Sequence, residues 1–121
     1  MSIEGKHHVQ LAMPAGKEVV AAEFYEGALG IPQVHKPPHL AVRGGCWFES
    51  PCVKIHLGVD PEFRPARKAH PGLLVSDLNA LVERLLRAGW SVRDDEPLHG
   101  FTRVYVDDPF GNRIELMERS C

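Results

Sequence analysis

The sequence has no long hydrophobic run and little net charge. No apolar segment approaches the roughly 20 residues that a membrane-spanning helix needs, and residues 1–6 lack the apolar core of a signal peptide. The formal net charge is −2 at pH 7, so electrostatics give no reason to expect nucleic acid or an anionic membrane as a partner. These absences favour a cytoplasmic protein.

Cysteine is also scarce. The three residues Cys46, Cys52 and Cys121 are an odd number and show no CxxC spacing, which favours reduced thiols over disulfides. A chain of 121 residues with 44% hydrophobic and 25% charged residues is typical of one globular domain, or of two small halves with a shared core. Seven histidines are many for this length, and they are the first indication of metal or proton chemistry.

Residue periodicity predicts the elements of the first half. Val9, Leu11 and Met13 alternate with polar residues as in a half-buried strand, and apolar residues then recur at helical spacing up to Gly30. The predicted elements are a strand over 7–13, a helix over 20–29, a loop or irregular edge strand over 31–39, a hairpin over 40–48 around Gly44-Gly45, and a strand over 53–59.

The same order of elements begins again after a connector over 60–69 that is rich in proline and charge. Ser76-Asp77 is suited to cap a helix, because short oxygen side chains accept hydrogen bonds from the free amides of a first turn, and Gly89 is suited to end it. The predicted elements are strands over 70–75, 90–92, 102–106 and 113–117, an amphipathic helix over 78–86, and a turn over 108–112.

The two halves align with each other after one gap of three residues. His8 and His70 are 62 positions apart, whereas His56 and Glu115 are 59 positions apart. Self-similarity of this kind indicates two copies of one supersecondary unit, here strand, helix and three strands.

Each βαβββ module covers one sheet face with its helix and leaves the other face free. We assign the first module to residues 3–59 and the second to residues 70–119, within a single domain over residues 1–121. Two such modules can curl their free faces into a shared concave cleft. The sequence therefore predicts an α+β fold in which two tandem modules form a cleft-bearing half-barrel or barrel.

Four side chains that can bind a metal fall on these free faces. Because side chains alternate along a strand, Glu115 points away from the apolar neighbours Ile114 and Leu116. The first and last strands of each module carry one candidate each, and a metal site needs three or four such donors to converge. The candidates are His8 and His56 in the first module, and His70 and Glu115 in the second.

Several sequence blocks resemble one family. They are His8-Val-Gln-Leu11, Phe24-Tyr-Glu-Gly-Ala-Leu-Gly30, His70 at the start of the second half, and Asp108-Pro-Phe-Gly-Asn-Arg-Ile-Glu-Leu116. With these blocks the chain resembles the vicinal oxygen chelate superfamily, which includes glyoxalase I, bleomycin-resistance proteins, fosfomycin-resistance enzymes and extradiol dioxygenases. The resemblance covers almost the whole chain.

The resemblance implies that the metal ligands are His8, His70 and Glu115. The remaining ligand position is occupied by His56 here, by Glu in glyoxalase I enzymes, and by a non-ligand in several three-ligand enzymes. Zn, Ni, Fe, Co or Mn would suit imidazole and carboxylate donors, and spacing does not select among them. The metal would act as a Lewis acid, and Glu115 is the candidate catalytic group that could move a proton.

Each candidate ligand also has an ordinary structural interpretation. Glu115 could be a strand carboxylate in a salt bridge, and His70 could be a surface histidine at the start of a strand. His7 could take the place of His8, although His7 shares a face with the apolar residues of its strand. His56 could line the cleft and contact substrate without binding metal.

Candidate substrate contacts come from the same faces. Arg103 and Tyr105 alternate with valines, so they should face the cleft, where a guanidinium could hold a carboxylate or a phosphonate. An arginine on an exposed strand remains the alternative for Arg103. Trp47 and Phe101 could line the cleft or close the core.

Three functions fit this pattern. The first is a small metal-dependent enzyme of the glyoxalase-like branch, a lyase or isomerase acting on a small oxygenated substrate. The second is a non-haem iron dioxygenase, because His8, His70 and Glu115 are two histidines and one carboxylate. The third is a metal-free protein that sequesters a drug or metabolite, as bleomycin-resistance proteins do. The resemblance also implies a homodimer.

Overall fold

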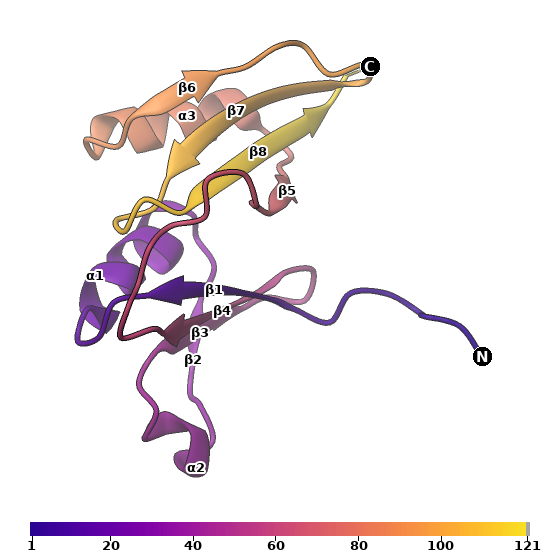
Figure 1. Ribbon diagram of the computed structural model, residues 1–121. Helices are drawn as coiled ribbons and strands as arrows, with labels where there is room; N and C mark the ends of the chain where they lie inside the picture. Colours follow the sequence, from indigo (N-terminus) through magenta and orange to yellow (C-terminus); the bar gives the residue numbers. More distant parts are fainter. Residues whose placement is uncertain (121) are drawn as a thin grey trace. The chain divides into compact units, whose positions relative to one another are not determined.

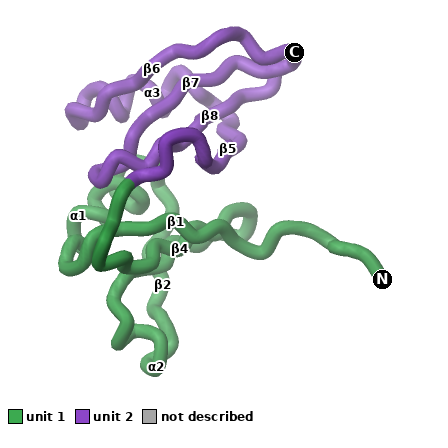
Figure 2. The backbone as a smooth tube through the Cα atoms, in the orientation of Figure 1, with its two compact units in different colours: residues 1–64 green, residues 65–121 purple. Residues whose placement is uncertain are grey.

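The computed structural model describes residues 1–120, so the predicted reduced thiol of Cys121 lies outside the described residues. The chain divides between Arg64 and Pro65 into two compact units (Figure 2). This boundary lies inside the connector predicted over residues 60–69. Below, unit 1 is the part before the boundary and unit 2 is the part after it.

Unit 1 is built around a four-stranded sheet with the order β1-β4-β3-β2. Strands β1 and β4 are parallel, whereas β4, β3 and β2 are mutually antiparallel neighbours. The elements in chain order (Figure 1) are β1 (Val9–Met13), α1 (Glu18–Ala22), the π-helical segment η1 (Glu23–Ala28), β2 (Gln33–Val34), α2 (Pro38–Ala41), β3 (Cys46–Glu49) and β4 (Lys54–Val59).

Unit 2 contains a four-stranded sheet of the same design, with the order β5-β8-β7-β6. Strands β5 and β8 are parallel, and the remaining pairs are antiparallel. Figure 1 shows helix α3 against one face of this sheet. The elements are β5 (Gly72–Leu74), α3 (Leu78–Arg87), β6 (Val92–Asp94), β7 (Phe101–Asp107) and β8 (Arg113–Arg119).

The two sheets also share one strand register. In unit 1 Leu11 lies opposite Leu57, and in unit 2 Leu73 lies opposite Leu116. Leu73 follows Leu11 by 62 positions and Leu116 follows Leu57 by 59, the same offsets that identified the sequence repeat. The predicted α+β architecture of two tandem βαβββ modules is confirmed.

Of the two predicted forms, a closed barrel is not formed by residues 1–120. Their strands belong to two separate four-stranded sheets, each with its own edge strands. Closing a barrel requires every strand to be hydrogen-bonded on both sides, and β1, β2, β5 and β6 each have one sheet neighbour.

In unit 1, alternation separates a core face of the sheet from a polar face. Phe48, Ile55 and Leu57 are almost fully buried, and the ring of Tyr25 from η1 stacks on Phe48 at 5.3 Å between centroids. The side chains that alternate with these core residues along β3 and β4 point to the other face of the sheet. This arrangement places His56 on the face opposite the core.

In unit 2, helix α3 is capped from two directions. The Ala80 amide donates to Asp77 Oδ1 at 3.1 Å, as the sequence predicts, and the Leu78 amide donates to Glu118 Oε1 at 2.6 Å. Two of the first free amides of the helix are therefore satisfied. Helix α3 has 10 residues, and no helix among residues 1–120 is long and apolar enough to cross a membrane.

The structure differs from the predicted elements at three places in unit 1. The first strand begins at Val9, so both neighbouring histidines precede it. The predicted helix is split into α1 and η1, where the Leu29 amide donates to the Phe24 carbonyl five residues back. The predicted hairpin over 40–48 is wrong, because residues 38–41 form α2 and β3 pairs with β2 and β4.

The glycine pair that suggested the hairpin has another role. Gly45 has φ +81, and a Cβ on it would lie 2.2 Å from the Leu57 carbonyl oxygen. Its amide donates to Glu18 Oε2 at 2.8 Å. Glycine is therefore required by close approach of two backbones as well as by a left-handed conformation, and not by a two-residue hairpin.

Candidate functional site

The predicted ligands of unit 2, His70 and Glu115, lie in contact. Glu115 is in β8 and is 7% exposed, and His70 precedes β5. The distance from His70 Nε2 to Glu115 Oε1 is 2.9 Å. On the other side of the ring, His70 Nδ1 donates to the Lys68 carbonyl oxygen at 2.7 Å.

This geometry assigns a role to each nitrogen of His70. A carbonyl oxygen only accepts, so Nδ1 carries a proton and the lone pair of the neutral ring is on Nε2. That lone pair points at an oxygen of a carboxylate. Two electron-pair donors at this distance need a cation between them, either a proton or a metal ion. A backbone carbonyl that orients the second nitrogen is also the usual support for a metal-binding histidine.

Arg103 holds the other oxygen of Glu115. Its NH1 group donates to Glu115 Oε2 at 3.1 Å and to the Tyr105 hydroxyl at 3.3 Å. Its remaining donors reach the Glu96 carbonyl at 2.8 and 3.2 Å, and Asp95 lies 3.4 Å away. The hydrogen bond to Glu115 raises the pKa of Arg103. Arg103 is therefore near the predicted ligand, but protein acceptors already use its donors.

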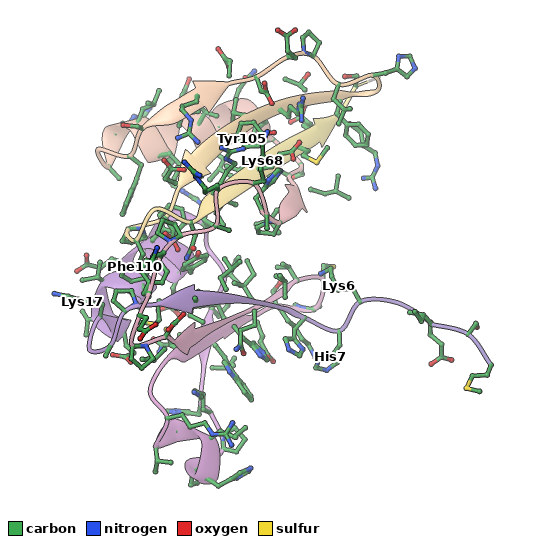
Figure 3. The ribbon with its side chains drawn as sticks, viewed as in Figure 1. Lys6, His7, Lys17, Lys68, Tyr105 and Phe110 are labelled. Atoms are coloured by element: carbon green, nitrogen blue, oxygen red, sulfur yellow. The ribbon has the colours of Figure 1, made fainter. Side chains whose placement is uncertain are left out.

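Tyr105, labelled in Figure 3, lies in β7 next to the strand that carries Glu115. It is directly opposite Glu115 in the register of β7 and β8, and its ring meets the His70 ring edge-on at 5.3 Å. Burial raises the pKa of Tyr105, and a hydrogen bond from its hydroxyl to Asp95 raises it further. Tyr105 thus forms an aromatic wall beside the pair and keeps its proton.

In unit 1, the predicted ligands His8 and His56 are also in contact. Their rings stack at 4.3 Å with an interplanar angle of 21°, and Trp47 stacks on the other face of His56 at 4.1 Å and 8°. His7 lies in the segment that leads into β1 (Figure 3), and its ring meets His8 rather than His56. The structure therefore places His8, and not His7, against His56.

Glu49 is a site residue that the sequence analysis missed. His56 Nε2 donates to Glu49 Oε2 at 2.7 Å, and this hydrogen bond lowers the pKa of the Glu49 carboxyl. Burial lowers the pKa of His56, although the bond to Glu49 opposes the shift. The signal was available, because alternation along β3 places Trp47 and Glu49 on one face.

The predicted ligands thus form two pairs. Among residues 1–120, no three His, Cys, Asp or Glu side chains are grouped closely enough to hold a metal ion. His8 and His56 pair in unit 1, and His70 and Glu115 pair in unit 2. Imidazole and carboxylate are donors that suit divalent transition metals. Each pair supplies fewer donors than a complete site needs, so the four-ligand centre stays a prediction.

The Asp-Pro-Phe-Gly-Asn block of the sequence forms the turn that precedes Glu115. Asp108 Oδ1 accepts from the amides of Phe110 at 2.9 Å and Asn112 at 2.8 Å, and Asn112 Nδ2 donates to Asp108 Oδ2 at 2.9 Å. These bonds fix the connection between β7 and β8. The block therefore acts on the site indirectly, by setting the register that carries Glu115.

Comparison with known families matches residues 7–116 to the Glyoxalase/Bleomycin resistance protein/Dioxygenase superfamily. Comparison with curated protein sequences gives no match. Among solved structures, the chain is similar to a protein from Bacillus anthracis assigned to the glyoxalase family. The two are 42% identical with a TM-score of 0.94, over 99% of this chain and 98% of the other.

More distant structures show the same fold. The fosfomycin resistance protein FosX from Listeria monocytogenes is 14% identical with a TM-score of 0.75, over 98% of this chain and 96% of that one. TnmS3, an antibiotic binding protein from Streptomyces sp. CB03234, is 21% identical with a TM-score of 0.72, over 98% and 100%. The match over residues 7–116, together with the Bacillus anthracis relative, shows that this chain belongs to the glyoxalase/bleomycin resistance protein/dioxygenase superfamily.

Proposed function

We propose that the chain is a small divalent-metal-dependent enzyme of the glyoxalase-like branch, a lyase or isomerase acting on a small oxygenated substrate. The observation that carries the proposal is the His70–Glu115 pair. The Lys68 carbonyl orients the ring so that Nε2 faces a buried carboxylate oxygen at 2.9 Å. A shared proton or a divalent metal ion would satisfy both atoms, and the donor types suit the metal.

The proposed ligands are His8, His56, His70 and Glu115, and Zn, Ni, Fe, Co or Mn would suit them. A bound metal would supply Lewis-acid stabilisation of negative charge on substrate oxygens. Family membership supports this assignment for His8, His70 and Glu115. For His56 the support is weaker, because Glu49 already accepts a hydrogen bond from its Nε2, which leaves Nδ1 as the donor atom of the neutral ring.

Protein side chains would do the remaining work. Glu115 would also move a proton to or from the substrate, while Arg103 holds its Oε2 and its Oε1 faces His70. Tyr105 and Trp47 would hold the substrate by ring contacts, since each lies against a candidate ligand histidine. Arg103 would fix the orientation of Glu115, and its predicted contact with substrate stays a prediction.

A second candidate function is a metal-free binding protein for a drug or metabolite. One observation favours it. Arg103 neutralises Glu115 and Glu49 occupies His56, so protein partners alone satisfy both buried groups. TnmS3, which shares the fold, is named an antibiotic binding protein. A non-haem iron dioxygenase that uses His8, His70 and Glu115 is the remaining enzymatic alternative.

Metal analysis of protein purified without chelators, followed by titration with Zn²⁺ and Co²⁺, tests the proposal. We expect one divalent ion per chain, and Glu115→Gln should lower the affinity by more than about 100-fold, because a lost ligand costs more than a lost supporting group. The amide oxygen of Gln can still accept from Arg103, so the fold should persist. Glu83→Gln, on exposed α3, is the matched control and should bind like the wild type.

The other outcomes separate the alternatives. A wild type that contains no stoichiometric metal and binds none on titration would support the metal-free binding protein. Bound iron, with oxygen consumption, would support the dioxygenase. His56→Gln tests the fourth ligand. If the variant binds metal with the affinity of the wild type, His56 lines the site without binding the metal.

We also infer that the protein works in the cytoplasm as a homodimer and acts on a small molecule. The free thiols of Cys46 and Cys52 support a reducing compartment. Family resemblance supports the dimer and the class of ligand. Cell fractionation would test the location, and protein found outside the cytoplasm would contradict it.

A further inference from the structure

Three arginines share the sheet face that carries Glu115. Arg93 lies opposite Tyr105, and Tyr105 lies opposite Glu115, so these three form one cross-strand row. Arg103 and Arg113 are each two residues from a member of that row along β7 and β8, and alternation places them on the same face. The three arginines bond to different partners, and this indicates that they have different roles.

Arg93 takes both oxygens of Asp107. Its NH1 donates to Oδ2 at 2.7 Å and its NH2 donates to Oδ1 at 3.1 Å, and this pairing raises the pKa of Arg93. Asp107 lies directly opposite Arg113 in the register of β7 and β8. Opposite charges at such positions normally attract each other. Here the carboxylate of Asp107, which lies across from Arg113, bonds to Arg93 instead.

Among residues 1–120, Arg113 therefore forms no direct salt bridge, although its positive charge adds to the hydrogen bond from the Glu96 backbone in lowering the pKa of Asp95. Within the same residues its side chain donates one long hydrogen bond, from NH2 to the Arg67 carbonyl at 3.5 Å. The guanidinium lies over the Tyr105 ring, 5.2 Å from its centroid. An arginine has five N–H donors. Most of these remain available, on a partly buried group that an aromatic face holds in place.

We propose that Arg113 binds an anionic group of the substrate, a carboxylate or a phosphonate. The planar fork of a guanidinium matches two oxygens of such a group. Arg113 is two residues from Glu115 on one face of β8 and stacks on Tyr105, which also contacts His70. The anion would thus bind beside the predicted metal ligands. The inference rests on the proposed function for the identity of the site, and it names the class of substrate.

The repeat supports the inference from unit 1. Lys54 precedes Arg113 by 59 positions and lies two residues before His56, as Arg113 lies two residues before Glu115. Its cross-strand neighbour is Glu49, whose carboxylate bonds to His56 instead. Each unit therefore places a basic side chain two residues before a predicted ligand, and in each unit the opposing acid makes its side-chain hydrogen bond to another residue.

Binding of methylphosphonate, followed by ³¹P NMR and calorimetry with and without Zn²⁺, tests the proposal. We expect saturable binding to the wild type and a loss of about tenfold or more in Arg113→Met. Arg113→Lys keeps the charge but loses the fork, so it should bind with intermediate affinity. Arg87→Met removes the same charge from an exposed position on α3 and should match the wild type.

Three results would overturn the inference. They are no saturable binding to the wild type, equal binding by Arg113→Met and the wild type, and equal binding of the uncharged dimethyl ester of the probe. Arg113→Lys guards against misfolding, because it preserves the contact with Tyr105. If Arg113→Lys also fails to fold, as judged by circular dichroism, the structural role of the guanidinium displaces the proposed one.

A Zn²⁺ titration of the same proteins keeps the two proposals apart. Unchanged Zn²⁺ affinity in Arg113→Met, together with lost anion binding, supports both. A wild type that binds methylphosphonate through Arg113 but binds no metal would refute the metal-dependent function and leave the anion site standing.

Discussion

At the scale of single residues, burial controls the chemistry of the thiols. Cys46 in β3 is 2% exposed, whereas Cys52 is exposed. Burial raises the pKa of Cys46 from 9.0 to about 11, with a smaller contribution from the negative charge of Glu18 and an opposing one from Lys36. A buried thiol in this environment behaves as a small apolar side chain rather than a nucleophile.

This shift predicts a loss of stability at high pH. Below pH 9 the Cys46 thiol is protonated in both the folded and the unfolded chain, so its contribution is fully present. Above pH 9 the unfolded chain ionises while the folded chain resists until about pH 11. The wild type should therefore lose about 2 kcal/mol of unfolding free energy across this range from Cys46. Urea denaturation at several pH values measures it.

Cys46→Ala provides the comparison, since every other titrating group is retained. Its unfolding free energy should be lower than that of the wild type at pH 8, because the substitution leaves a cavity. The gap should shrink as pH rises from 9 to 11. Two curves that stay parallel over this range would show that the buried thiol does not resist ionisation.

At the scale of elements, two glycines with similar backbone angles have different surroundings. Gly16 has φ +78 and no atom within 4 Å of a Cβ built on it, whereas Gly45 has φ +81 and would place a Cβ 2.2 Å from the Leu57 carbonyl oxygen. Leu57 lies in β4, the strand that carries His56. Gly45 thus allows the entry to β3 to pass close to β4.

Gly16→Ala and Gly45→Ala form a matched pair. Gly16→Ala should cost about 1–2 kcal/mol of unfolding free energy, the usual cost of a left-handed non-glycine residue. Gly45→Ala adds a backbone clash and should cost at least about 2 kcal/mol more. Thermal and urea denaturation of both variants measure the difference. If both cost the same, the contact between Gly45 and β4 is not tight in solution.

At the scale of the whole molecule, the duplication gives each unit its own pair of predicted ligands. Each unit supplies one histidine Nε2 that faces a carboxylate, His56 with Glu49 and His70 with Glu115. The two pairs are not built alike, because the partner comes from β3 in unit 1 and from β8 in unit 2. Two donors do not complete a metal site, so neither pair by itself is the complete metal site that the sequence predicts.

We predict a homodimer at micromolar concentration. Superfamily resemblance supports it, and a family site can combine modules of two chains. Sedimentation velocity should give twice the chain mass of 13.5 kDa. A single species at the mass of one chain would contradict the prediction and would require each chain to complete its site alone.

The sequence by itself determined the repeat, the fold class and the types of side chain on each strand face. Periodicity is local, so alternation along β4 and β8 was enough to place His56 and Glu115 opposite the core. Gly30 and Gly89 likewise ended the helices as predicted, because a left-handed backbone favours glycine wherever it occurs. The match of residues 7–116 to the superfamily agrees with the fold class that this pattern indicated.

Only the tertiary structure decided which side chains are partners. Whether Asp107 pairs with Arg93 or Arg113, and whether Glu115 pairs with Arg103, depends on distances between strands that no local pattern encodes. The same holds for the hairpin that does not form, since the approach of Gly45 to β4 is a long-range contact. The sequence identifies the charged residues, but the geometry between strands determines which of them remains available for a ligand.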